Sequence, residues 1–216
     1  MNDPNRILIV DDHPIVVQGF TQLLEKEPDL TVCGSASGMI EAREKIRELF
    51  PDLVLLDISL SGQNGLELVK DLAKEAPETL ILIVSLHDES VYAERSLRAG
   101  AKGFIMKTEP IGKILTAVRE VLKGNIYASD ALKGSILKRM QNPRNLEASP
   151  VDTLSDRELE VFSLIGEGMT TRQISEALNL GIKTVETHKL KIRKKLNIDT
   201  GNELTRYAVE WRINNT

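Results

Sequence analysis

The chain has 216 residues, of which 41% are hydrophobic and 28% charged, and its formal net charge is −4. This composition supports a packed core, and the mild negative charge argues against a protein that coats nucleic acid or an anionic membrane with its whole surface. The single cysteine, Cys33, excludes an internal disulfide and fits a reducing compartment. The N-terminus lacks a signal-peptide pattern, and no apolar run approaches the roughly 20 residues of a membrane span. We therefore expect a cytoplasmic protein with no membrane partner.

Residues 5–123 alternate short apolar runs with longer amphipathic stretches. The apolar runs, which we predict to be strands, lie at residues 6–10, 31–33, 52–56, 79–84 and 103–106. The amphipathic stretches between and after them are typical of helices, at residues 14–27, 39–50, 66–76, 91–99 and 111–123. Three of the runs are apolar on both faces, as strands in a helix-covered parallel sheet are. The pattern predicts an α/β doubly wound domain with a five-stranded parallel sheet in the order 2-1-3-4-5, which binds ligands at the carboxyl ends of its strands.

Beyond residue 123 the alternating pattern stops. Residues 129–140 form a candidate helix capped by Ser129 or Asp130. Residues 141–150 have the proline, asparagine and serine content of a linker, and only helical patterns follow. We therefore predict a first domain, an interdomain helix with a linker, and an all-α second domain, over residues 5–123, 124–150 and 151–216.

Polar side chains follow four of the predicted strands. Asp11 and Asp12 come directly after the first strand and Asp57 after the third, and these two strands are neighbours in the predicted order. Carboxylates this close repel one another unless a cation joins them, and Mg²⁺ is the hard divalent ion that best suits such oxygen ligands. Ser85 ends the fourth strand and Lys107 follows the fifth. Together the groups suit a phosphoryl group held on an aspartate, whereas each alone is more simply a helix cap or a solvated charge.

This set resembles the site of receiver domains in bacterial two-component response regulators, which share the pattern Asp11, Asp12, Asp57, Ser85, Phe104 and Lys107. The resemblance implies that Asp57 accepts phosphate from a sensor histidine kinase. It also implies that Asp12, Asp57 and the backbone carbonyl of Ser59 bind Mg²⁺, with Asp11 contributing through water. Lys107 would pair with the phosphoryl oxygens, Ser85 would swing to hydrogen-bond them, and Phe104 would turn inward. By spacing alone, Phe104 is equally explained as part of the core.

The chain departs from the receiver pattern at two places. Leu60 and Ser61 stand where many receivers have Met-Pro, and Thr108 follows the lysine where proline is usual. A cis Lys-Pro bond is therefore absent. Neither change removes a functional group, so the resemblance leaves only loop stiffness and the rate of phosphotransfer open.

Two further positions concern the lifetime of the phosphoryl group. Ser59 and His87 lie two residues beyond Asp57 and Ser85. In receivers these positions flank the path of the hydrolytic water, so we expect both residues to influence dephosphorylation. His87 has the alternative interpretation of a surface loop residue.

Short helices joined by turns fill the second domain. A Ser-x-x-Glu capping box starts the first helix at Ser155, and a second short helix starts at Thr170 or Thr171. We expect residues 179–181 to form a tight turn, in which Gly181 is free to take a positive φ, before a third helix over residues 182–196. A helix, a short turn and a helix is the arrangement that lays a recognition helix in the major groove of DNA.

The third helix is strongly basic. It carries one acid, Glu186, against six bases: Lys183, Lys189, Lys191, Arg193, Lys194 and Lys195. For an isolated helix a solvated basic face is the simpler interpretation. The preceding helix and turn instead favour binding to double-stranded DNA, in which phosphate contacts supply most of the affinity.

Residues 154–161 and 184–188 are similar to the LuxR-type helix-turn-helix of the NarL/FixJ response regulators, and the resemblance spans about residues 151–213. It implies a fold of four helices. It also implies contacts with base edges and phosphates from the third helix, through Lys183, Thr184, Glu186, Thr187, Lys189, Leu190, Lys191 and Lys194. We expect His188 to be half-buried instead. The last helix corresponds to the family's dimerisation helix, with an apolar face of Leu204, Tyr207, Ala208 and Trp211. That face has the alternative role of closing the domain's own core.

The sequence thus predicts a phosphorylation-controlled transcriptional regulator, not an enzyme. Phosphorylation of Asp57 would unmask the second domain, which then binds DNA as a homodimer on paired half-sites. RNA polymerase is a further candidate partner. Two alternatives stay open. One is a phosphohydrolase with Asp57 as nucleophile, although such enzymes usually have an acid where this chain has Ser59. The other is a DNA-binding regulator that works without phosphorylation.

Overall fold

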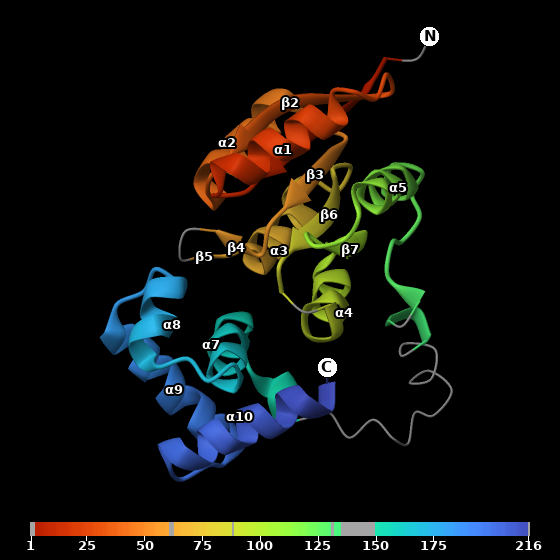
Figure 1. Cartoon of the computed structure of the whole chain (residues 1–216). Coiled ribbons are helices and arrows are strands. Elements are labelled where there is room, and N and C mark those ends of the chain that lie inside the picture. The colour runs from red at the N-terminus through yellow and green to blue at the C-terminus, as the bar shows by residue number, and fades with distance from the viewer. Residues whose placement is uncertain (1–2, 61–62, 88, 131, 135–149, 216) are drawn as a thin grey trace. The chain divides into compact units, whose positions relative to one another are not determined.

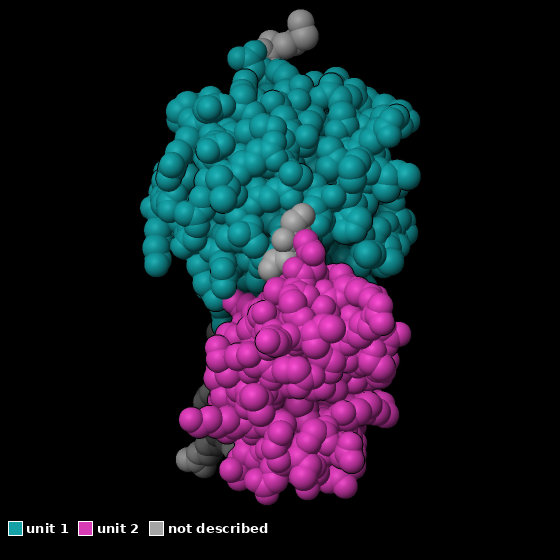
Figure 2. Space-filling model, turned by 90° about the vertical axis from the view of Figure 1, so that its left-hand side faces the viewer, with its two compact units in different colours: residues 1–134 teal, residues 135–216 magenta. Residues whose placement is uncertain are grey.

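The structure is a computed structural model that describes residues 3–60, 63–87, 89–130, 132–134 and 150–215. The chain divides into two compact units, which we call unit 1 (residues 1–134) and unit 2 (residues 135–216) (Figure 2). The division falls within the predicted interdomain segment 124–150, so the first part of that segment belongs to unit 1. None of the helices in the described ranges is both long and apolar enough to cross a membrane.

A five-stranded sheet forms the centre of unit 1 (Figure 1). In spatial order its strands are β2 (Leu30–Ala36), β1 (Asn5–Val10), β3 (Leu53–Leu56), β6 (Leu80–Ser85) and β7 (Gly103–Met106). All neighbouring strands run parallel. This confirms the predicted order 2-1-3-4-5, because β6 and β7 are the fourth and fifth strands of this sheet along the chain. The register pairs Val10 with Leu56, so the residues that follow β1 and β3 meet at one edge.

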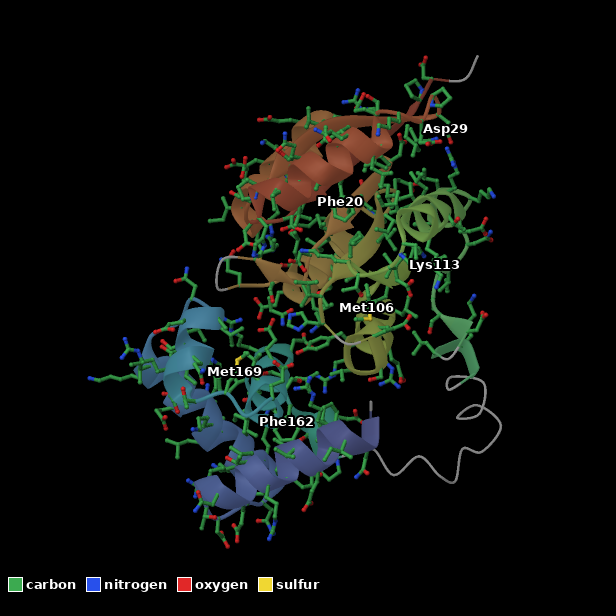
Figure 3. The ribbon with its side chains drawn as sticks, in the orientation of Figure 1. Phe20, Asp29, Met106, Lys113, Phe162 and Met169 are labelled. Carbon is green, nitrogen blue, oxygen red and sulfur yellow. The ribbon has the colours of Figure 1, made fainter. Side chains whose placement is uncertain are left out.

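In the described part of unit 1, five helices of 11 or 12 residues cover this sheet, because its strands are apolar on both faces. They are α1 (Pro14–Leu24), α2 (Met39–Leu49), α3 (Gly65–Glu75), α4 (Glu89–Ala99) and α5 (Ile111–Leu122). Phe20 of α1 and Val118 of α5 pack in one buried cluster with Leu55 of β3 (Figure 3). Leu8 and Leu56, which alternate with that set along their strands, are also fully buried. The doubly wound fold is therefore confirmed.

Two local features of unit 1 were not predicted. An antiparallel hairpin of β4 (Ser59–Leu60) and β5 (Gln63–Asn64) follows β3. After α5 the chain returns to the sheet, where Tyr127 forms a parallel bridge with Gly103. The Ser129 hydroxyl then accepts a hydrogen bond from the Leu132 amide, as expected for the cap of the predicted helix 129–140. Residues 130 and 132–134 are helical, whereas residue 131, residues 135–140 and nearly all of the predicted linker lie outside the described residues.

Unit 2 is helical throughout its described part. A 3-10 turn, η2 (Pro150–Thr153), precedes four helices: α7 (Asp156–Gly166), α8 (Thr171–Ala177), α9 (Ile182–Leu196) and α10 (Gly201–Asn215). Capping boxes start α7 at Ser155 and α8 at Thr170. The buried core contains Phe162, Ile174, Val185, Ile192 and Leu204 (Figure 3). The predicted four-helix arrangement is therefore confirmed.

The turn between α8 and α9 differs from the prediction. Gly181 has a φ of −65° and is the N-cap of α9, in an extended conformation. Asn179 has the positive φ, 49°. The chain reverses directly after α8, at a position where asparagine tolerates the left-handed region. Gly181 therefore does not adopt the positive φ that its lack of a side chain permits.

Candidate functional site

Three carboxylates meet at the carboxyl edge of the sheet in unit 1. Asp11 and Asp12 follow β1, and Asp57 follows β3, its neighbour in the sheet. Asp11 and Asp57 are buried, with exposed fractions of 4% and 5%. One ligand atom from each of these carboxylates and from His13 lies within 4.8 Å of the others. The arrangement expected from the sequence is present.

Lys107, the residue after β7, links two of these carboxylates. Its Nζ lies 2.6 Å from Oδ2 of Asp11 and 2.7 Å from Oδ2 of Asp57, and the lysine side chain is only 7% exposed. Burial tends to lower the pKa of Lys107, but the two carboxylates outweigh burial and raise it above its usual value. Lys107 is therefore a cation at neutral pH.

The charges around Asp57 favour the binding of a further cation. Burial raises the pKa of Asp57 above its usual value, Lys107 lowers it, and the nearby Asp11 raises it further. One ammonium is shared between two buried carboxylates, so it cannot neutralise both. An added cation would relieve the remaining repulsion. Clustered carboxylate oxygens are the donors that a hard divalent ion prefers.

His13 joins this cluster, which the sequence did not predict. Its Nδ1 lies 2.9 Å from Oδ1 of Asp12 and 3.2 Å from Oδ1 of Asp11. The only sequence signal is its position directly after the two aspartates. His13 is the N-cap residue of α1, and its amide donates to Oδ1 of Asp11 at 3.0 Å.

A second group of side chains connects the loops after β3 and β6. The Ser59 hydroxyl lies 2.8 Å from Nε2 of His87, and the His87 amide donates to the Ser85 hydroxyl at 3.2 Å. The His87 ring packs on Tyr92 of α4 with a centroid distance of 4.6 Å. Burial, assisted by Lys107, lowers the pKa of His87 to about 4. His87 is therefore a neutral, packed residue and not a free surface residue.

Phe104 and Gly65 are two further buried positions in unit 1. Phe104 on β7 is fully buried in this structure, as expected for a residue of the core. Gly65 is a functional position that sequence reasoning missed: a Cβ there would lie 2.3 Å from the Asp57 carbonyl oxygen. The hairpin can fold back beneath Asp57 only because this residue lacks a side chain.

In unit 2, the predicted DNA-contacting residues lie mostly on one exposed part of α9. Lys189 is half-buried, and the other seven are exposed: Lys183, Thr184, Glu186, Thr187, Leu190, Lys191 and Lys194. The Thr171 hydroxyl at the start of α8 donates to Glu186 and accepts from Lys189, at 2.8 and 2.9 Å. These contacts fix the first half of α9 against α8.

The two remaining bases of α9 serve the domain's own structure. Lys195 Nζ lies 2.6 Å from the buried carboxylate of Glu158 on α7. Arg193 Nε donates to the carbonyl of Ile198 at 3.4 Å. The basic charge of α9 is therefore divided between an exposed face and internal contacts. His188 is half-buried, as expected.

The apolar face of α10 closes the core of unit 2. Leu204 and Ala208 are fully buried, and the rings of Tyr207 and Trp211 lie 6.0 and 5.5 Å from that of Phe162. In this structure Leu204 and Ala208 are not available to a second chain. Of the four residues predicted to form the dimer contact, only Tyr207 and Trp211 are partly exposed.

Comparison with known proteins identifies both units. Residues 7–119 match the response regulator receiver domain, and residues 152–208 match the luxR family of bacterial regulatory proteins. The oxygen regulatory protein NreC of Staphylococcus aureus is 37% identical over 213 residues, which cover 96% of this chain and 98% of NreC.

Solved structures of response regulators are also similar to this chain. A LuxR-family two-component response regulator from Aurantimonas sp. SI85-9A1 is 31% identical, with a TM-score of 0.59 over 64% of this chain and 99% of that chain. RcsB of Salmonella enterica serovar Typhimurium, solved on the rprA promoter with the phosphomimetic BeF₃⁻, has a TM-score of 0.62 over 96% of this chain and 99% of its own. At 21% identity, RcsB supports the fold alone. The chain therefore belongs to the NarL/FixJ family of two-component response regulators, which are DNA-binding regulators of transcription.

Proposed function

We propose that Asp57 accepts a phosphoryl group from a sensor histidine kinase in a Mg²⁺-dependent step, and that this modification controls DNA binding by a dimer of the chain. The observation that carries the proposal is the ammonium of Lys107 held between Asp11 and Asp57 at the edge of the sheet. Family membership favours a transcription regulator over a phosphohydrolase. The proposal therefore concerns how that regulator is controlled.

The donor set fits Mg²⁺. Carboxylate oxygens from separate strand ends converge, and Lys107 alone cannot balance their charge. Asp12, Asp57 and the backbone carbonyl of Ser59 would hold the ion, with Asp11 acting through water. When bound, Mg²⁺ would neutralise charge that develops on the phosphoryl oxygens.

The residues of the chain have separate roles in the transfer. A carboxylate oxygen of Asp57 forms a bond to phosphorus while the nitrogen–phosphorus bond of the kinase phosphohistidine breaks, and the imidazole leaves. Lys107, already 2.7 Å from Asp57, would pair with an oxygen of the transferred group. The Ser85 hydroxyl, which now accepts from the His87 amide, would turn to donate to another oxygen. Phe104 would then move into the space that Ser85 leaves.

The second half of the proposal concerns DNA. The exposed side of α9 would enter the major groove, with Glu186, Thr187 and either Leu190 or Lys191 facing base edges. Thr184, Lys189 and Lys194 would reach phosphates, and Lys183 would add to the positive surface. Tyr207 and Trp211 of α10 are the candidates for contact between two chains. Binding through phosphates makes the affinity depend strongly on salt.

Two measurements on the full-length protein test the proposal. Intact-mass analysis after incubation with acetyl phosphate should show one Mg²⁺-dependent phosphoryl group, absent from Asp57→Ala. Fluorescence anisotropy with a duplex selected by the protein from random sequence should show tighter binding with beryllium fluoride and Mg²⁺, but not for Asp57→Ala. If beryllium fluoride does not change the affinity for DNA, the proposed control by phosphorylation is contradicted, whereas DNA binding itself is not. Catalytic turnover of a phosphomonoester would instead favour the phosphohydrolase.

A further inference from the structure

The chain after α5 is bound along the outer edge of the sheet. We call residues 125–130 and 132–134 the returning segment. The Tyr127 amide donates to the Lys102 carbonyl at 2.9 Å, and the Tyr127 carbonyl accepts from the Phe104 amide at 3.0 Å. This is the pairing of one further parallel strand beside β7. A Cβ on Gly103 would lie 3.0 Å from both Cβ and the carbonyl oxygen of Tyr127. Glycine at this strand position therefore permits the close approach of the segment.

Side chains hold the returning segment as well. Ala128 and Leu132 are buried, with exposed fractions of 4% and 7%, and the ring of Tyr127 packs against the apolar cluster between the sheet and α5. The Ser129 amide donates to the Glu89 carboxylate at 3.0 Å. Glu89 is the first residue of α4. The segment is thus fixed at two places, on β7 and on α4.

The contacts of the returning segment with β7 and with α4 both lie next to residues that the proposed phosphorylation would rearrange, Phe104 and Ser85. The β7 contact is made by the backbone of Phe104 itself. The α4 contact lies two residues beyond His87, whose amide is bonded to the Ser85 hydroxyl. A shift of Ser85 moves the chain that leads into α4, and a shift of Phe104 disturbs its hydrogen bond to Tyr127. Packed elements of this kind change between discrete arrangements and do not deform gradually.

We propose that the returning segment transmits the state of Asp57 to the chain that leads into unit 2. It is docked on β7 and α4 in the unphosphorylated protein, and it is released when Ser85 and Phe104 rearrange. This inference rests on the proposed function. It adds a regulatory contact that the site residues alone do not provide. Coupling between two equilibria is reciprocal, so a variant that loosens the segment must also favour binding of the phosphoryl mimic.

Hydrogen exchange of the full-length protein with Mg²⁺, followed by mass spectrometry, tests the release directly. Beryllium fluoride should slow exchange in peptides around Asp57 and speed it severalfold in peptides that contain the amides of Tyr127, Ser129 and Leu132. Exchange in α2, which packs on β2 at the opposite edge of the sheet from β7, should stay the same.

Two variants test the reciprocity. Leu132→Ala removes a buried contact of the segment, and Glu89→Ala removes a single hydrogen-bond acceptor with little risk to folding. Each should raise the apparent affinity for beryllium fluoride about fivefold, the lower end of typical coupling, as measured by protection of the Asp57 peptides. Glu67→Ala is the matched control, because Glu67 is also an acid in the first turn of its helix, α3. It should leave the affinity unchanged.

The outcomes separate the two proposals. Protection around Asp57 with no change in the returning segment would overturn the inference and leave the proposed function standing. Unchanged affinity in both Leu132→Ala and Glu89→Ala would overturn it as well. If beryllium fluoride protects no peptide around Asp57, the proposed function fails and the inference fails with it.

Discussion

The hydroxyl of Ser59 lies 2.8 Å from Nε2 of His87, and this contact joins the loops after β3 and β6 beside Asp57. The Tyr92 ring packs against the His87 ring, at a centroid distance of 4.6 Å. Burial, with a further contribution from Lys107, lowers the pKa of His87 to about 4. A group with so low a pKa is a poor base for a hydrolytic water at neutral pH. The pair is therefore better suited to covering the phosphoryl group than to activating water.

This arrangement predicts that His87→Ala shortens the half-life of the phosphorylated protein. Opening the cover admits water, and we expect a change of about threefold or more, which corresponds to roughly 0.7 kcal/mol in the barrier. The measurement is release of phosphate from protein labelled with acetyl phosphate. Ser59→Ala should act in the same direction, and the double variant should show less than the product of the two effects, because the residues form one contact. Equal half-lives of the phosphorylated native protein and His87→Ala, within error, would contradict the prediction that His87 protects the phosphoryl group.

Gly65 provides a second prediction. A methyl group at this position would lie 2.3 Å from the backbone oxygen of Asp57, and neither backbone can move away without disturbing the site. We expect Gly65→Ala to lower the free energy of unfolding of unit 1 by about 2 kcal/mol or more. The reference is Gly19→Ala in α1, where a Cβ meets nothing within 4 Å.

Because alanine forms helix better than glycine, Gly19→Ala should instead stabilise unit 1 by up to about 1 kcal/mol. Urea denaturation followed by circular dichroism measures both variants. The transition of unit 2 is identified separately by the fluorescence of Trp211, the only tryptophan in the chain. Equal stability of Gly65→Ala and the native protein would contradict the steric argument.

The convergence of the acidic cluster could be predicted from sequence for a physical reason. Parallel strands that are apolar on both faces must pair side by side, and their carboxyl ends then share an edge. Asp11, Asp57 and Lys107 meet there whatever the detail of the loops. The same holds for α7 to α9, because capping boxes start α7 and α8 and apolar spacing marks all three helices.

Contacts that depend on loop conformation could not be predicted. The approach of His13 to Asp12 and the bond between Ser59 and His87 require particular backbone and side-chain torsions. The need for glycine at position 65 appears only when the hairpin is folded beneath Asp57. The residue with positive φ in the turn before α9 could not be predicted either, because asparagine and glycine both tolerate that conformation. Spacing alone does not decide between them.

His188 predicts how the stability of unit 2 depends on pH. Its Nδ1 is buried and has no hydrogen-bond partner in the described part of the chain. Burial lowers its pKa below the usual value, with help from the nearby charges of Arg157 and Lys191. The unfolded chain, with a histidine pKa of about 6.5, therefore takes up a proton before the folded domain does. The stability that His188 contributes is complete above that pH and declines as pH falls through the lower folded value.

The measurement is urea denaturation followed by Trp211 fluorescence at pH 7.5 and pH 5.5. The native midpoint should fall between the two conditions more than that of His188→Gln, which has no charge to gain. Parallel shifts in the two proteins would show that other groups cause the pH dependence.

Adjacent lysines on α9 give the sharpest test of the DNA-binding surface. Lys194 is exposed and assigned to a phosphate, whereas Lys195 is bonded to Glu158 and to the Thr153 carbonyl, at 2.6 and 3.0 Å. Lys194→Ala should weaken binding to all duplexes alike and reduce the slope of log affinity against log salt by about 1. Its effect on the stability of unit 2 should be small.

Lys195→Ala should show the opposite pattern. It leaves the carboxylate of Glu158, which is 4% exposed, without its cation, and we expect a loss of about 1 kcal/mol or more in the free energy of unfolding. Because Lys195 is held by its own domain, the salt slope should stay the same in conditions where the variant is folded. Anisotropy titrations at several salt concentrations and Trp211-monitored unfolding separate the two effects. Equal salt slopes for Lys194→Ala and the native protein would show that α9 meets DNA through a different face.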